Sequence, residues 1–307
     1  MFNRRKFIQN AGLATLAFGI GKFPFEALAE GALEKLVLLH TNDTHSRMEP
    51  FPEGSRFEGM GGISRRATLI KSIRSREKNV LLVDAGDIFQ GTPYFNFYLG
   101  EPEIKSMSMM GYDLATLGNH DFDAGLDGLK RQLPNASFDF VSANYDFKDT
   151  ILENEFKPYK VFQKGNIKIG ILGLGIKLEG LVPPSLYGNT KYTDPVKAAN
   201  KYSEILKNDY NCNYVIALSH LGFRYADPER ISDHTIASQT ENIDMIIGGH
   251  THTFLDEPVL LKNKLGKDVI INQVGWGGIR LGRIDLYFDK KNMKIFSLKP
   301  NTVILDK

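Results

Sequence analysis

The sequence contains a single cysteine, Cys212, which excludes an internal disulfide framework and any Cys-x-x-Cys metal or redox pair. It has no run of 18 or more apolar residues, so no transmembrane helix is predicted. It also lacks an excess of either charge, with 38 Lys and Arg against 36 Asp and Glu and a formal net charge of +2. This balance argues against nucleic acid or an anionic membrane as the main partner. We expect Cys212 to be buried or half-buried.

The rest of the composition is that of an ordinary globular protein, with 42% hydrophobic and 24% charged residues. No internal repeat, low-complexity segment or interdomain linker is apparent in the sequence. We therefore predict one α/β domain over residues 30–307, preceded by a segment with a different function.

Residues 1–29 have the pattern of an export signal. A basic stretch, Arg4-Arg5-Lys6-Phe7-Ile8, precedes a short Ala- and Gly-rich apolar region and then Ala27-Leu28-Ala29, a small-x-small cleavage pattern. The paired arginines resemble a twin-arginine signal; an ordinary signal or an amphipathic tail is the alternative. We expect cleavage near Ala29 and a periplasmic or extracellular location.

Alternating and continuous apolar runs predict the elements of the remaining chain. Buried strands are expected at residues 35–41, 79–83, 113–117, 138–143, 167–174, 214–218, 243–247, 269–274, 283–288 and 294–298. Residues 158–163 are expected to pair with 166–171 as a hairpin. Helices are expected at residues 62–78, 126–133 and 194–207, the last opened by Asp194 as its N-cap. The aromatic-rich segment 88–99 is expected to pack into the core.

Five of the predicted strands end directly before groups that can bind a metal or move a proton. In chain order these groups are Asp43 and His45, Asp84, Asn119 and His120, His220, and His250 and His252. The carboxyl ends of strands are the usual place for chemistry in an open α/β sheet. Five of the seven histidines belong to this set, whereas His40 and His234 have no place in it and are interpreted as structural.

The segment Gly118-Asn119-His120-Asp121-Phe122-Asp123 is the centre of this pattern. Asn119 offers a neutral oxygen, His120 an acid, base or metal ligand, and Asp123 can orient that histidine. A simple strand-end turn of Gly, Asn and Asp remains the alternative. For Trp276, between two glycines, a place beside the site and a packed position in a turn both remain open.

Together these motifs resemble the calcineurin-like metallophosphoesterase superfamily, whose pattern is Asp-x-His, Gly-Asp, Gly-Asn-His-Asp/Glu, His and Gly-His-x-His. More narrowly, residues 41–45, 61–66, 86–93 and 118–125 resemble the catalytic domain of the 5′-nucleotidase family, which includes UDP-sugar hydrolases and cyclic-nucleotide phosphodiesterases. The resemblance implies an α/β fold, a four-layer αββα sandwich of two mixed sheets flanked by helices. It also implies a hydrolase for phosphate esters, nucleotides or related compounds.

The resemblance assigns a role to each residue of the set. One divalent ion would be bound by Asp43, His45 and His252, the other by Asn119, His220 and His250, with Asp84 bridging them. Donors of this kind suit Zn, Mn, Fe or Co, and the activity implied is attack by a metal-activated hydroxide. Asn119 and His120 would contact the substrate, and His120, held by Asp123, would be catalytic.

Two departures from the family pattern leave several functions open. The nucleotidase branch often has an amide residue where this chain has His252. The sequence ends at Lys307, so we expect the chain to lack the C-terminal domain that selects nucleotides in two-domain nucleotidases. The chain is then expected to be a phosphatase or phosphodiesterase acting alone, or to be completed by a separate protein carrying that domain. A pyrophosphatase, an enzyme for an exported phospholipid head group or sulfur ester, and a metal-loaded binding scaffold also stay open.

Overall fold

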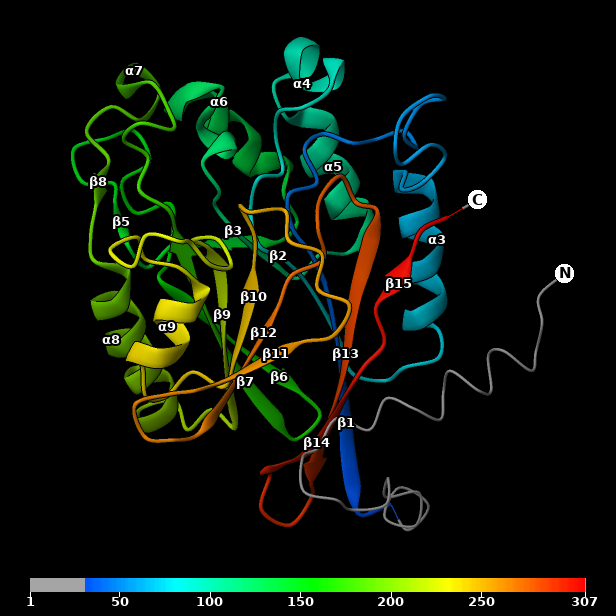
Figure 1. The fold of residues 1–307 in the computed structure, drawn as a ribbon, viewed down its shortest axis with the longest axis vertical. Helices are drawn as coiled ribbons and strands as arrows, with labels where there is room; N and C mark the ends of the chain where they lie inside the picture. The colour runs from blue at the N-terminus through cyan, green and yellow to red at the C-terminus, as the bar shows by residue number, and fades with distance from the viewer. Residues whose placement is uncertain (1–30, 307) are drawn as a thin grey trace, which may run out of the picture.

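Two mixed β-sheets lie face to face in the computed structural model, which describes residues 31–306 (Figure 1). The first sheet has the order β14-β13-β1-β2-β3-β4, with β15 paired to β13. Its strands are β1 (Leu33–Thr41), β2 (Val80–Asp84), β3 (Leu114–Thr116), β4 (Asp139–Val141), β13 (Arg280–Asp289), β14 (Ile295–Pro300) and β15 (Val303–Ile304). The predicted signal segment 1–29 lies outside the described residues.

The second sheet has the order β11-β12-β10-β9-β7-β6. Its strands are β6 (Tyr159–Lys164), β7 (Ile167–Gly175), β9 (Tyr214–His220), β10 (Met245–Gly248), β11 (Val259–Lys262) and β12 (Asp268–Asn272). A separate two-stranded ribbon pairs β5 (Tyr145–Asp146) with β8 (Lys191–Tyr192). The predicted hairpin is confirmed, because β6 runs antiparallel to β7 with Gln163 opposite Lys168.

Helices cover the outer face of each sheet. The apolar faces of α3 (Ile63–Arg74), α4 (Pro93–Tyr98), α5 (Glu101–Met110) and α6 (Gly125–Gln132) pack on the first sheet. Those of α8 (Pro195–Asn208) and α9 (Asp233–Gln239) pack on the second, on the opposite side of the molecule from α3 (Figure 1). Short helices α7 (Pro184–Tyr187), η1 (His120–Phe122) and η2 (Leu133–Asn135) occupy the connections. The predicted four-layer αββα arrangement is confirmed.

The alternation of side chains along the strands produces the central layer. In β1, Leu36 and Leu38 point between the sheets and meet Ile169 and Ile216 of the second sheet, whereas Leu39 points outward beneath the helices. This is the burial expected of strands that are covered on both faces. Within residues 31–306, every helix falls short of the length and apolar character that a membrane span requires.

Local signals account for some helix positions and fail at others. The Asp194 side chain accepts hydrogen bonds from the backbone N–H groups of Val196 and Lys197, so its predicted N-cap role is confirmed. In the aromatic-rich segment Phe95 is buried as expected. The expectation is wrong for Phe97 and Tyr98, whose exposed fractions are 79% and 56%, because α4 buries only one face.

His40 is buried between the two sheets, which fits its structural interpretation. Its Nε2 accepts a hydrogen bond from Asn272 Nδ2 at 3.0 Å. The facing strand residue is Gly282, where an added Cβ would lie 2.1 Å from that nitrogen. Burial lowers the pKa of His40 to about 3.

We predict that His40 makes the fold less stable as the pH falls. The folded protein resists protonation of His40, whereas the unfolded chain binds this proton near pH 6.5, so acid favours the unfolded state. Relative to His40→Gln, the wild type should lose about 1.4 kcal/mol of unfolding free energy per pH unit between pH 6 and 4. Denaturant unfolding of both proteins at fixed metal concentration measures this. A difference that stays constant with pH would contradict it.

Candidate metal centre

The carboxyl ends of five strands meet at one edge of the sandwich. β1, β2 and β3 are parallel neighbours in the first sheet, and β9 and β10 are parallel neighbours in the second. The ends of these strands and the loops that follow them carry the predicted ligand residues, and the structure brings most of these residues together in two groups of side chains that could hold a metal ion.

The first group consists of Asp43, His45 and His252. The Nε2 atoms of His45 and His252 lie 3.0 Å apart. Asp43 Oδ1 lies 3.4 Å from Nε2 of His252 and 4.0 Å from Nε2 of His45. Three donor atoms from both sheets therefore surround one point.

The second group consists of Asp87, His220 and His250. Asp87 Oδ2 lies 3.1 Å from His220 Nε2. Asn119 adds a neutral oxygen, because its Oδ1 lies 2.8 Å from His250 Nδ1. Asp87 Oδ2 is also 3.8 Å from Nε2 of His45, so this one oxygen lies between the two groups.

Asp84, expected to bridge the ions, belongs to neither group. Its carboxylate accepts hydrogen bonds from Thr41 Oγ1 at 2.6 Å and from the backbone N–H of Gly86 at 2.9 Å, and burial raises its pKa to about 7. As the last residue of β2, it shares a strand face with Leu82, which packs under the helices. Asp87, beyond the Gly86 turn, occupies the position expected of Asp84. The Gly-Asp motif in the sequence marked this residue.

The backbone of the site is held in an uncommon conformation. Asp43, His45, Asp87, His250 and His252 all have positive φ, between 48° and 73°. Each such residue costs on the order of 1–3 kcal/mol and persists only where the surrounding structure imposes it. Such outliers concentrate at functional sites, which supports a ligand-binding role for this edge.

The buried carboxylate of Asp121 joins two of the loops. It accepts hydrogen bonds from four backbone N–H groups, those of Asp87, Ile88, Phe89 and Gly118, at 2.8–3.2 Å. Gly118 is needed where the loops touch, because an added Cβ would lie 2.2 Å from Asp87 Oδ1. No role was predicted for Asp121 from the sequence, although it lies within the segment 118–123 at the centre of the predicted site.

The donor set fits divalent cations. The Nδ1 of His220 donates to the backbone oxygen of Ala85 at 2.7 Å, and that of His45 lies 3.3 Å from the backbone oxygen of Phe89, which leaves both Nε2 lone pairs facing the centre. His220 Nε2 is buried without a hydrogen bond of acceptable geometry, despite the short distance to Asp87. Nitrogen and carboxylate donors without thiolate suit Zn, Mn, Fe or Co.

The electrostatics of the site also favour positive charge at its centre. Burial alone would lower the pKa of His220, but the carboxylates of Asp87 and Asp43 raise it to about 10. Burial lowers the pKa of His45, and burial together with His220 lowers that of His250 to about 4. Metal binding requires neutral imidazoles, so a bound divalent ion would take the place of the proton that these carboxylates favour on His220.

His120 and Asp123 lie beside the two groups, as the sequence suggested. His120 Nδ1 is 2.7 Å from Asp123 Oδ2, and the ring centroids of His120 and His45 are 5.3 Å apart. The hydrogen bond to Asp123 raises the pKa of His120. The His120 backbone N–H donates to Asp87 Oδ1 at 2.8 Å, so the histidine and the carboxylate between the groups are positioned together.

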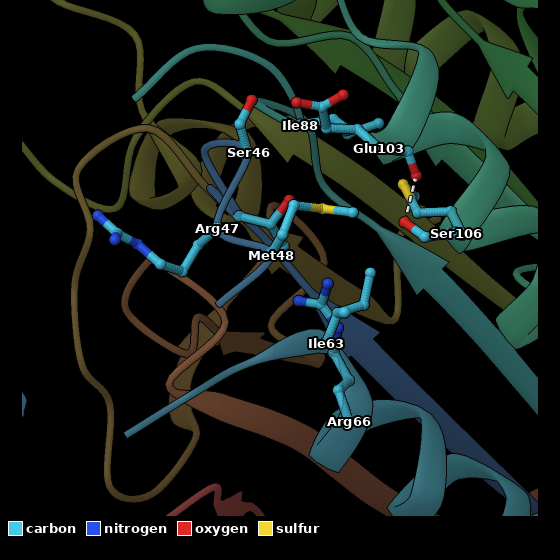
Figure 2. Close-up of a pocket in the computed structure, with 10 residues that line it drawn as sticks. Ser46, Arg47, Met48, Ile63, Arg66, Ile88, Glu103 and Ser106 are labelled. Carbon is cyan, nitrogen blue, oxygen red and sulfur yellow. Dashed lines mark hydrogen bonds between the residues drawn. The ribbon is translucent and has the colours of Figure 1, made fainter. Parts of the chain in front are cut away.

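A small cavity lies beside the loop that carries Asp43 and His45 (Figure 2). Its volume of about 10 Å³ is enough for roughly one water molecule. Both carboxylate oxygens of Glu103 lie buried here without a hydrogen bond, and burial raises the pKa of this group. The cavity is too small for an organic substrate, and none of the residues of the two groups lines it.

Comparison with known proteins agrees with this geometry. Snake venom 5′-nucleotidase of Gloydius brevicauda is 36% identical over 92% of this chain and 50% of its own length. The 5′-nucleotidase of Homo sapiens is 34% identical over 95% of this chain and 53% of its own length. The 5′-nucleotidase precursor of Thermus thermophilus superposes with a TM-score of 0.78 and 33% identity, over 89% of this chain and 55% of its own.

The chain thus spans about half the length of the curated relatives it matches. The calcineurin-like phosphoesterase family matches residues 36–254, from β1 to beyond His252. The chain belongs to the calcineurin-like phosphoesterase family.

Proposed function

We propose that the chain is a dinuclear-metal phosphoesterase that hydrolyses nucleotides or related phosphate esters. The observation that carries this proposal is the position of Asp87 Oδ2 between the two ligand groups, with the His120–Asp123 pair beside them. A binding scaffold has no need of that pair. The 5′-nucleotidase relatives support nucleotides as the substrate class.

In this proposal one divalent ion is held by Asp43, His45 and His252 and the other by Asn119, His220 and His250. Asp87 is shared between them, in place of Asp84. The ions would polarise the phosphoryl oxygens and activate a water for attack on phosphorus.

His120 is the group that moves a proton. Asp123 engages Nδ1, so Nε2 is the nitrogen available to a substrate, and the hydrogen bond to Asp123 raises the pKa of the ring, which favours its protonated form. In that form it can stabilise charge on the transferring phosphoryl group or protonate the leaving oxygen. We also propose that Asn119, the preceding residue, contacts the substrate.

The function is tested by hydrolysis assays on the metal-reconstituted chain. AMP, a UDP-sugar, p-nitrophenyl phosphate, bis-p-nitrophenyl phosphate and a sulfur ester are compared. We expect turnover of phosphate esters, and a ~10²–10⁴-fold lower kcat in His120→Asn with unchanged metal content. Inactivity on every phosphate ester would contradict the proposal. Turnover of the two p-nitrophenyl esters alone would mean that the metal centre is competent but that residues 1–307 do not select nucleotides by themselves.

His252→Asn is the matched control for His120→Asn. It makes the same chemical change at a residue assigned to metal binding, so it should reduce the metal content. If His120→Asn also loses metal, His120 is a ligand rather than the proton-moving group.

A second prediction separates Asp84, at the end of β2, from Asp87, in the loop that follows. Asp87→Asn should reduce the content of both ions, because it removes the shared carboxylate. Asp84→Asn should retain both ions, since within residues 31–306 the hydrogen bonds of that carboxylate are with Thr41 and Gly86. Elemental analysis of purified protein after dialysis gives the metal stoichiometry of each variant. The opposite result would return the bridging role to Asp84.

We further propose that the chain is exported through a twin-arginine signal, on the basis of Arg4, Arg5 and the Ala27-Leu28-Ala29 pattern. Replacing Arg4 and Arg5 by Lys should abolish export, whereas Lys6→Arg should not. Cell fractionation of the full chain in a bacterium with this pathway measures the result. Equal export of the double-lysine protein would indicate an ordinary signal.

A further inference from the structure

His252 differs from the other histidines of the site in how its ring is held. The Nδ1 atoms of His45 and His220 face backbone oxygens, whereas no hydrogen bond to His252 Nδ1 is found within residues 31–306. The side chain of His252 is 39% exposed, against 10% for His45 and 0% for His220. Metal-binding histidines are usually oriented through the ring nitrogen that does not bind the metal.

Trp276 contacts the His252 ring and can orient it where a hydrogen bond to Nδ1 is missing. Its ring stacks on the His252 ring with a centroid distance of 5.5 Å and an interplanar angle of 11°. It also meets the His45 ring edge-on at 6.4 Å. The stack limits rotation of the imidazole while Nε2 faces Asp43 and His45.

Trp276 is itself held firmly enough for this task. Phe51 and Phe57 meet its ring edge-on at 5.2 Å and 6.3 Å. The backbone N–H of Gly277 donates to the backbone oxygen of Asp43 at 2.7 Å, which fastens the tryptophan turn to the loop of the first ligand group. Gly277 has φ +64°, and an added Cβ would lie 2.6 Å from the Phe51 ring.

We propose that Trp276 is a positioning residue that keeps the His252 imidazole oriented as a metal ligand of the first group. This rests on the proposed metal centre. Trp276 acts through His252 and on one ion only, since its contacts are with the Asp43, His45 and His252 group and none is recorded with Asp87, His220 or His250 in the described part of the chain.

The test measures metal affinity, in the absence of substrate. Zn²⁺ or Mn²⁺ is titrated in competition with a chromophoric chelator against wild type, Trp276→Leu and Trp276→Phe. We expect Trp276→Leu to weaken one of the two binding events by ~10–100-fold and leave the other unchanged. Trp276→Phe, which keeps a flat ring, should restore most of the affinity. Equal weakening of both events, or no change, would overturn the proposal.

A double-variant cycle separates positioning from a general effect on folding. In a His252→Gln background, Trp276→Leu should have no further effect on metal affinity, because its target ring is gone. The same loss in both backgrounds would show that Trp276 acts on the fold instead.

The same titration distinguishes this proposal from the proposed function. Wild type that binds two ions but hydrolyses no phosphate ester would contradict the phosphoesterase assignment and leave the role of Trp276 intact. Wild type that binds no ion would overturn both.

Discussion

The site depends on one carboxylate, that of Asp121, which accepts hydrogen bonds from backbone N–H groups of two loops. By binding Asp87, Ile88 and Phe89 on one side and Gly118 on the other, it holds the end of β2 against the end of β3. Asp87 is thereby placed between the two ligand groups, and its second oxygen accepts the His120 N–H. The carboxylate between the groups and the His120–Asp123 pair therefore share one support.

The strained backbone of the ligand residues has a related cause, the meeting of several loops at one edge of the sandwich. Loops from two sheets must turn sharply to direct carboxylates and imidazoles at one region, and five of these residues adopt positive φ to do so. The surrounding layers offset this cost: strands buried on both faces and helices packed outside give the loops rigid ends. Rigid elements that carry precise loops suit a family whose chemistry relies on fixed charge and orientation.

Most of the fold could be placed from the sequence because the signals involved are local. Continuous apolar runs marked β1, β7 and β9, and Asp194-Pro195 marked the start of α8. α5 and α9 were not predicted, although their starts carry local signals: Glu101 and Glu103 lie in the first turn of α5, and Ser232 forms a capping box with Thr235 at the start of α9. The exposure of Phe97 and Tyr98 was missed because composition cannot tell which face of α4 meets the core.

The sequence alone identifies the groups that can bind a metal or move a proton at the strand ends. His and Asp side chains lie directly after apolar runs, in an order typical of one family. The tertiary structure decided which of them meet. Asp84 ends β2 and Asp87 lies in the loop that follows, and only strand alternation and the Gly86 turn send one under the helices and the other to the centre. The stacking of Trp276 on His252 joins residues from different loops, a contact that depends on how two sheets pack rather than on any local pattern.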